Sequence, residues 1–428
     1  MTRTPPLDAR PLNHSDYRTL ALAALGGALE FYDFVVFVFF TKALSGIFFP
    51  PHMSEWLRQL QTFGIFAAGY LARPLGGIVI AHFGDLLGRK RMFTLSILLM
   101  AVPTLGMGLL PTYENVGAAA PVLLLLLRIL QGAAIGGEVP GAWVFVSEHV
   151  PERHTGFAVG TLTAGLTAGI LLGSLVATGI NTALTPAQVA LFGWRIPFLL
   201  GGGFGFLAVY LRRFLEETPV FKQMHASRAL SEELPLKTIL RGHFPAVLLS
   251  MALTWVLSAA IVVVILFTPT YLQTAFKVLP RVSLQANSVA IVSLTCGCVV
   301  FGWLADRIGS KFALSAGSLA LLASSSYFYH SLPLDGPALF LAYAVTGFFV
   351  GSIGVIPFIL VRAFPPKIRF SGLSFSYNVA YAIFGGLTPV MLTLWLKSDK
   401  LAPAHYVAAL AALGALLAFA PARGTRRG

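Results

Sequence analysis

Three acidic residues stand within long apolar runs of the sequence, where an ionised side chain is costly to bury. Glu30 and Asp33 lie three residues apart in one run, and Glu138 lies in another. Residues at this spacing share a helix face, so Glu30 and Asp33 can share a proton or a basic partner. Two carboxylates this close repel each other when both are ionised, which favours a bound proton. We expect proton coupling at Glu30 and Asp33, with Glu138 as a second station; structural ion pairs are the alternative.

Three arginines lie in similar runs. Arginine keeps its charge at any working pH and can hold a carboxylate through two parallel hydrogen bonds. Arg73 and Arg128 are therefore predicted to bind an anionic group of a substrate, unless they are permanent partners of the buried acids. Glu138 follows Arg128 by ten residues, or about 15 Å of helix, so the two are not expected to pair directly. Arg195, next to Trp194, is predicted to be an interfacial anchor.

Neutral polar side chains recur in the second half of the chain. Tyr377, Asn378 and Tyr381 fall on one side of a helix and are predicted to hydrogen-bond a substrate, although helix–helix contacts are an equal alternative. Glycine and proline also cluster here, and we expect them to let two helices bend or pack closely. These clusters are Gly351, Gly354 and Pro357 in one run and Gly385, Gly386 and Pro389 in the next.

The elements that carry these residues are predicted to be membrane spans. Of the 428 residues, 56% are hydrophobic and only 11% are charged, with a mean hydropathy of +0.78. So much apolar surface exceeds what a soluble fold can bury, which predicts an all-α membrane protein. The only cysteines, Cys296 and Cys298, lie in one apolar run, which argues against a disulfide framework or a zinc site. No catalytic triad or nucleotide-binding motif is found, so neither an enzyme nor a cofactor is predicted.

Apolar runs between charged, proline and glycine clusters predict twelve transmembrane helices in two six-helix bundles. The bundles cover 20–211 and 244–420; a charged loop, 212–243, joins them, and 1–19 and 421–428 are tails. The predicted spans are 20–42, 57–83, 92–110, 121–147, 157–180, 190–211, 244–275, 284–305, 312–332, 337–361, 372–396 and 403–420.

Basic residues are unequally distributed between the two sides of these spans. With the N-terminus inside, every inner loop is basic. This bias predicts a multi-pass protein of the inner (plasma) membrane with both termini cytoplasmic. It also accounts for the net charge of +13 without a nucleic-acid partner, because the charge is scattered over many loops. The outer segments receive only Lys42, Arg58, Lys277, Arg281, Lys397 and Lys400.

One loop pattern occurs twice. Asp85-Leu-Leu-Gly88-Arg89-Lys90 follows the second span, and Asp306-Arg307-Ile-Gly309-Ser-Lys311 follows the eighth, at an offset of 221 residues. Such a repeat predicts that each half is one structural unit. Glycine permits a tight turn, and the aspartate at a helix end can pair with the basic residues or with a neighbouring helix. We predict that these are gating loops; ordinary basic inner loops are the alternative.

These two loops resemble the signature of the major facilitator superfamily, whose members are built from repeated bundles. Three further stretches are similar to its metabolite:proton symporter family, which includes carriers for citrate, 2-oxoglutarate, shikimate and proline or betaine. The resemblance adds Tyr32 and Gln131 to the candidate substrate-binding residues. Segments typical of sugar porters and drug antiporters are absent, which disfavours those classes. The three stretches are Leu29-Glu30-Phe31-Tyr32-Asp33-Phe34, the run from Arg128 to Glu138, and the run from Gly193 to Pro219.

Together with the resemblance, these features predict a monomeric, proton-coupled symporter that imports a small organic acid, such as a di- or tricarboxylate, by alternating access. Its substrate site is expected between the bundles near the membrane midplane. Its partners would be the substrate, protons and the lipid bilayer. Two alternatives stay open: a zwitterion or osmolyte carrier of the same family, and a membrane sensor that keeps the fold without transport.

Overall fold

The structure is a computed structural model that describes residues 11–87, 89–211, 239, 241–365 and 368–420. For residues 78–87, 89–94, 96–97, 137–138 and 211 it describes only the backbone. Most of the predicted loop 212–243 and the tail 421–428 therefore lie outside the described residues.

The described helices make twelve passes, one for each predicted span. The first six are α1 (His14–Phe39), α3 (Glu55–Leu87), α4 (Arg89–Leu109), the α6–α7 pass, α8 (Thr155–Ala183) and α10 (Ile196–Leu211). The α6–α7 pass consists of α6 (Ala119–Ala134), η2 (Ile135–Gly137) and α7 (Glu138–His149). Short helices α2 (Thr41–Ile47), α5 (Tyr113–Val116) and α9 (Pro186–Leu191) lie in the connections.

The second six passes include three that are interrupted. The first is α13 (Phe244–Ala260), η6 (Ile261–Phe267) and α14 (Thr268–Ala275). It is followed by α15 (Pro280–Ile308) and α16 (Ser310–His330), and then by α17 (Gly336–Val350), η7 (Gly351–Val355) and α18 (Ile356–Ala363). The last two passes are α19 (Arg369–Ala380) with η8 (Tyr381–Gly385) and α20 (Gly386–Trp395), and α21 (Ala402–Leu417).

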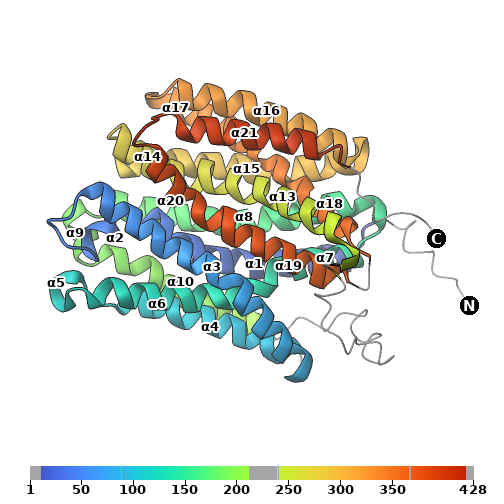
Figure 1. The fold of residues 1–428 in the computed structure, drawn as a ribbon, viewed down its shortest axis with the longest axis horizontal. Helices are drawn as coiled ribbons and strands as arrows, with labels where there is room; N and C mark the ends of the chain where they lie inside the picture. The colour runs from blue at the N-terminus through green and yellow to red at the C-terminus, as the bar shows by residue number, and fades with distance from the viewer. Residues whose placement is uncertain (1–10, 88, 212–238, 240, 366–367, 421–428) are drawn as a thin grey trace, which may run out of the picture.

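The passes form two bundles that meet along their length (Figure 1). In the N-terminal bundle, α1 packs on α8, α3 on α6 and α4 on α10; in the C-terminal bundle, α15 packs on α17, α16 on α21 and α13 on α19. The bundles contact each other mainly through α8 with α15 and through α3 with α20. We call the end where α1 begins and α21 ends the terminal end, and the other the opposite end.

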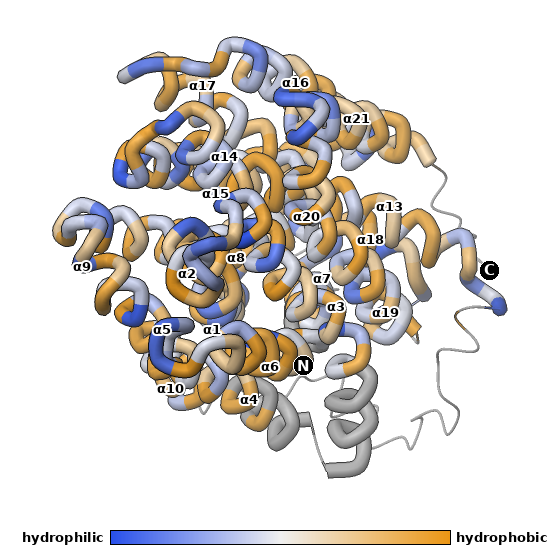
Figure 2. The backbone as a smooth tube through the Cα atoms, turned by 60° about the vertical axis from the view of Figure 1, so that its left-hand side comes forward, coloured by the Kyte–Doolittle hydropathy of each residue, from blue (hydrophilic) through white to orange (hydrophobic). Residues whose placement is uncertain are grey.

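The outer surface of the helices is apolar, as a lipid-facing surface must be. Leu75, Leu341 and Leu416 are 70%, 68% and 73% exposed. Figure 2 shows hydrophobic residues along the helices and hydrophilic ones concentrated near their ends. Within the described residues, seven helical stretches are long and apolar enough to cross a membrane.

Three of the four interruptions in the described helices, η2, η7 and η8, contain glycine, and one pair repeats between the halves. η2 interrupts the fourth pass and η7 the tenth, with starts 216 residues apart. At each one a glycine packs on the backbone of a neighbouring helix: a Cβ at Gly136 would lie 2.7 Å from Gly77 N, and one at Gly351 would lie 2.5 Å from Gly297 C. The expectation of close packing is confirmed at Gly351 and Gly354, where an added Cβ would lie 2.5 Å and 2.7 Å from backbone atoms of α15.

The first helix begins six residues earlier than predicted. Asn13 and Asp16 form a capping box, in which Asp16 N donates to Asn13 Oδ1 and Asn13 N donates to Asp16 Oδ2, both at 2.9 Å. These bonds satisfy backbone N–H groups at the helix start, so the helix extends before the apolar run begins.

Candidate functional site

Arg73 of α3 lies at the boundary between the bundles, surrounded by aromatic rings. Its guanidinium carbon is 4.8 Å from the centre of the Tyr381 ring, 5.5 Å from Tyr70, 5.7 Å from Tyr377 and 6.0 Å from Phe34. Two of these rings come from each bundle, and we call the four the aromatic cage. Arg73 is only 2% exposed, so the attraction between its charge and the rings is little weakened by water.

The cage also joins the bundles. The Tyr70 ring stacks on the Tyr381 ring, with centres 5.3 Å apart and planes at 11°. Tyr377 packs edge-on against Trp143 of α7 at 5.2 Å, and Asn378 donates a hydrogen bond to the Gly136 carbonyl. The side chains at 377, 378 and 381 thus all contact the N-terminal bundle, and their hydrogen bonds to a substrate stay a prediction.

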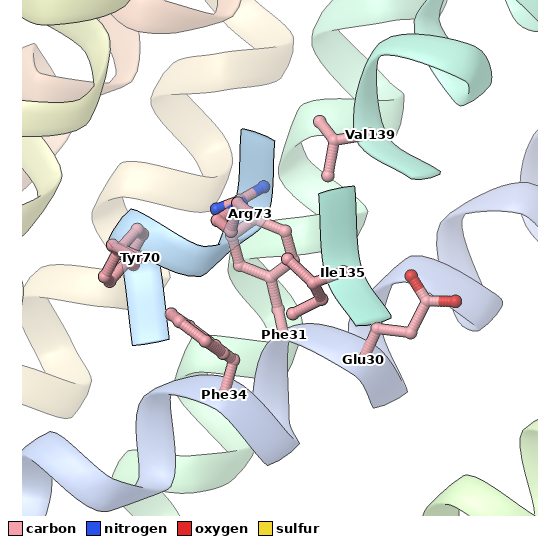
Figure 3. A pocket seen from close by; sticks show the side chains of 7 residues that line it. All are labelled: Glu30, Phe31, Phe34, Tyr70, Arg73, Ile135 and Val139. Carbon is pink, nitrogen blue, oxygen red and sulfur yellow. The ribbon is translucent and has the colours of Figure 1, made fainter. Parts of the chain in front are cut away.

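A small cavity adjoins the cage (Figure 3). Its volume is about 10 Å³, near the least that can hold one water molecule. The carboxylate of Glu30 lies at the edge of the cavity away from Tyr70 (Figure 3). The structure thus brings Glu30 and Arg73 to one cavity, and in this conformation the cavity is too small for a substrate. Its lining is Glu30, Phe31 and Phe34 from α1, Tyr70 and Arg73 from α3, and Ile135 and Val139 from η2 and α7.

Glycines hold α3 and the α6–α7 pass close together behind this cavity. A Cβ at Gly76 would overlap the carbonyl oxygen of Ala133, and a Cβ at Gly132 would overlap that of Gly69. Backbones can approach this closely only where side chains are absent. The glycines near Arg128 in the sequence therefore fix how α3 presents Arg73 to the other bundle.

Arg128 lies within the N-terminal bundle and is fully buried. Its Nη2 donates to the Phe34 carbonyl at 2.7 Å and its Nη1 donates to Gln131 Oε1. Gln131 Nε2 donates in turn to Thr104 Oγ1 at 2.6 Å and to the Asp33 carbonyl at 3.1 Å. Arg128 and Gln131 thus tie α1, α4 and α6 together, and the oxygens that accept these hydrogen bonds are uncharged.

Tyr32 and Asp33 face α10 and not the cage. The Tyr32 hydroxyl donates to the Pro197 carbonyl at 2.9 Å. A Cβ at Gly201 of α10 would lie 2.5 Å from Asp33 Oδ1, so the carboxylate fits only because residue 201 is glycine. Within the described part of the chain, neither carboxylate oxygen of Asp33 has a hydrogen-bond partner, although the side chain is fully buried. A buried carboxylate in this position is a candidate for proton exchange.

Polar contacts close the terminal end between the bundles. Asp306, in the last turn of α15, accepts hydrogen bonds from Gly156 N at 2.8 Å and Phe157 N at 2.7 Å, at the start of α8. Arg369 of α19 pairs with Glu148 of α7 at 3.1 Å. The predicted tight turn at Gly309 is confirmed by its φ of 91°. Arg307 and Lys311 are exposed beside it.

The contacts of the first-half loop and of Glu138, the predicted second proton station, lie outside what the structure describes. Gly88 and the side chains of Asp85, Arg89, Lys90 and Glu138 lie outside the described residues. Their proposed roles stay predictions.

A second cavity opens at the opposite end, between α3, α14 and α20. Its volume is about 410 Å³. Charged residues Glu55, Lys397 and Lys400 line it together with aromatic ones, and Lys397 Nζ lies 3.3 Å from the centre of the Trp56 ring. This cavity is large enough for a small organic molecule.

Two bundles of six passes with a buried charged site between them are typical of secondary transporters built from repeated bundles. Comparison of the sequence with known families identifies the family. The family profile described as Major Facilitator Superfamily matches residues 34–389. The chain belongs to the major facilitator superfamily. The resemblance inferred from the loop motifs is therefore confirmed.

Relatives of this major facilitator carry names that concern proline and betaine. A Staphylococcus aureus (strain COL) protein, provisionally named a proline/betaine transporter, is 34% identical over 414 residues, which cover 94% of this chain and 87% of that protein. The glycine betaine/proline/ectoine/pipecolic acid transporter OusA of Dickeya dadantii (strain 3937) is 31% identical over 417 residues, covering 93% and 82%. The solved structure of the proton:xylose symporter XylE bound to 6-bromo-6-deoxy-D-glucose superimposes with a TM-score of 0.77 over 96% of this chain and 97% of that one. At 17% identity this last likeness shows the shared fold.

Some residues of this major facilitator's site were not predicted from sequence. The cage residues Phe34 and Tyr70 are ordinary aromatic positions in apolar runs, and only their spacing from Glu30 and Arg73 along a helix face could have indicated them. Nothing in the sequence pairs Glu148 with Arg369.

Proposed function

We propose that this chain is a proton-coupled secondary transporter that imports a small zwitterion, such as proline or a betaine, by alternating access. The observation that carries the proposal is the juxtaposition of Arg73, Glu30 and four aromatic rings at the contact between the bundles. A zwitterion offers a carboxylate to arginine and a cation to aromatic rings and carboxylates.

From the sequence, an organic-acid carrier was expected and a zwitterion carrier was the alternative. This proposal favours the zwitterion carrier. A di- or tricarboxylate needs several cationic partners, whereas the cavity combines one arginine, Arg73, with an acid, Glu30. An extra carboxylate on the substrate would be repelled by an ionised Glu30. The names of the relatives also favour proline or betaine over an organic acid.

Alternating access is supported by the contacts at the two ends. The bonds from Gly156 and Phe157 to Asp306, together with the ion pair between Arg369 and Glu148, close the terminal end. The opposite end holds the cavity of about 410 Å³. Because the loops predicted at the terminal end are the basic ones, we propose that this end is cytoplasmic and that the larger cavity is the external entrance.

For proton coupling we propose Asp33 as the carrier and Glu30 as the group nearest the substrate. Asp33 is adjacent to the cage residue Phe34, whose carbonyl is held by Arg128. A movement of this segment of α1 would alter both the surroundings of the Asp33 carboxylate and the cage. Protonation and substrate binding can therefore bias the same conformational change.

The test is uptake into proteoliposomes that contain the purified chain. Radiolabelled proline, glycine betaine, citrate and 2-oxoglutarate would be offered with and without an imposed pH gradient, and empty liposomes serve as the control. We expect proline or betaine to accumulate only with an inward proton gradient. Gradient-driven accumulation of a carboxylate in place of the zwitterions would refute the substrate assignment, and zwitterion uptake indifferent to the gradient would refute proton coupling.

A further inference from the structure

The aromatic cage already holds a cation, and that cation belongs to the protein. The Arg73 guanidinium lies within 6.0 Å of the centres of four rings. No ion pair joins it to a carboxylate of the described residues. Guanidinium is a delocalised, weakly hydrated cation, and in these respects it resembles a quaternary ammonium group.

Among the described residues, the cavity beside the guanidinium has no room for a second cation. The adjoining cavity of about 10 Å³ holds at most one water molecule. A substrate cation can therefore enter the cage only if the guanidinium leaves. Arg73 is able to leave, because its side chain is long and its guanidinium is not paired with a carboxylate of the described residues. Its Nε also has no hydrogen-bond partner in the described part of the protein.

We propose that Arg73 is a place-holder for the cationic group of the substrate. In the substrate-free, closed protein its guanidinium occupies the cage. When a zwitterion binds, its quaternary or secondary ammonium group replaces the guanidinium between the rings, and the released guanidinium binds the substrate's carboxylate. This inference rests on the proposed function and deepens it, because it assigns the two charges of the zwitterion to separate parts of one site.

The exchange explains why both charges would be required. A cation without a carboxylate would displace the guanidinium and leave a buried charge without a partner, which is unfavourable. An anion without a cationic group would draw Arg73 away and leave the cage empty. Tyr70 and Tyr381 come from different bundles, and a cation between the rings attracts both of them. Without that cation, the contact between the bundles is weaker.

The decisive experiment compares a zwitterion with a lone cation in Arg73→Met. Binding of glycine betaine and of tetramethylammonium to the purified full-length chain would be measured by titration calorimetry. For glycine betaine we expect binding about tenfold or more weaker, because a charge-assisted hydrogen bond to its carboxylate is lost. For tetramethylammonium we expect binding at least about threefold tighter, because no guanidinium has to be displaced. The opposite signs distinguish a place-holder from a residue that only supports the fold.

A second pair of variants tests the cage without altering Arg73. Tyr381→Leu removes one ring and is expected to weaken glycine betaine binding about fivefold or more, whereas Tyr381→Phe keeps the ring and should bind as the wild type does. Tyr327→Leu is the matched control, because Tyr327 is 64% exposed on the outer surface of α16. If Arg73→Met does not fold, this pair decides the question.

Two results would overturn the inference while leaving the proposed function intact. They are tetramethylammonium binding that is unchanged or weaker in Arg73→Met, and glycine betaine binding by Tyr381→Leu that equals the wild type. Failure of the proposed function is a different result, in which the wild type neither binds nor accumulates any zwitterion while binding a carboxylate. That result would overturn both.

Discussion

Replacing Asp306 by asparagine should loosen the terminal end of the protein. Both carboxylate oxygens of Asp306 accept backbone hydrogen bonds at the start of α8, at 2.8 Å and 2.7 Å. Asparagine keeps one acceptor oxygen but presents an amide N–H₂ group to the other donor and loses the charge that favours a helix N-terminus. One charge-assisted bond contributes about 1.5–3 kcal/mol, and we take about 1–2 kcal/mol because the site is partly exposed.

This free energy corresponds to a shift of about 5- to 30-fold toward the state that is open at the terminal end. The direct assay is hydrogen–deuterium exchange, because the two donors are themselves exchangeable amides. Peptides that contain Gly156 and Phe157 should exchange about 5- to 30-fold faster in Asp306→Asn. The maximal rate of transport should also fall, whereas substrate binding should be little changed, because Asp306 neither lines the small cavity nor belongs to the aromatic cage.

Two comparisons make the result interpretable. Arg369→Gln removes an ion pair whose side chains are 20% and 23% exposed, so its effect should be smaller, at about 1 kcal/mol or less. Asp335→Asn, at the start of α17, serves as the matched control, because the Asp335 side chain makes no capping bond. Unchanged amide exchange at the start of α8 together with an unchanged maximal rate in Asp306→Asn would refute the gating role.

Three further predictions follow from the buried residues of the N-terminal bundle. Asp33→Asn should abolish uptake driven by a pH gradient but preserve substrate exchange across proteoliposomes, and gradient-driven uptake at the wild-type rate would exclude Asp33 from coupling. Arg128→Lys should lower the thermal unfolding temperature in detergent, because it removes the hydrogen bond to the Phe34 carbonyl, which contributes about 1–3 kcal/mol of stability. An unchanged unfolding temperature would contradict the structural role of Arg128. Gly76→Ala should destabilise the protein by about 3 kcal/mol, because the new Cβ overlaps a backbone carbonyl of α6, whereas Gly46→Ala, with nothing within 4 Å, should be tolerated; equal unfolding temperatures would refute this packing argument.

The sequence alone determined the number and order of the membrane passes. An apolar run long enough to cross the bilayer has one stable outcome in lipid, because each backbone N–H and C=O must be bonded within its own helix. It also identified the repeated loop pattern and glycines at which helices pack closely. Helix ends were less certain, since the capping box at Asn13 and Asp16 acts on polar residues that precede the apolar run.

The sequence likewise identified the buried charged residues, but it did not predict which neighbouring helix each side chain would meet. Glu30 and Asp33 were expected to share a face, yet Glu30 lines the cavity and Asp33 lies against Gly201 of α10. A spacing of three places two side chains about 60° apart around a helix, which is enough for each to meet a different neighbour. Arg128 was also treated as equivalent to Arg73, whereas it holds the backbone of α1.

Only the tertiary structure decided what surrounds Arg73. Tyr70 and Tyr381 are separated by more than three hundred residues of sequence, and they stack because α3 and the α19–α20 pass lie side by side across the bundle boundary. Periodicity along one helix fixes which residues share a face, but it carries no information about which distant helix that face will meet. That choice is made by close packing between the helices, here at Gly386 of α20, where an added Cβ would lie 2.7 Å from Tyr70 Cβ. This packing places rings of both bundles around Arg73.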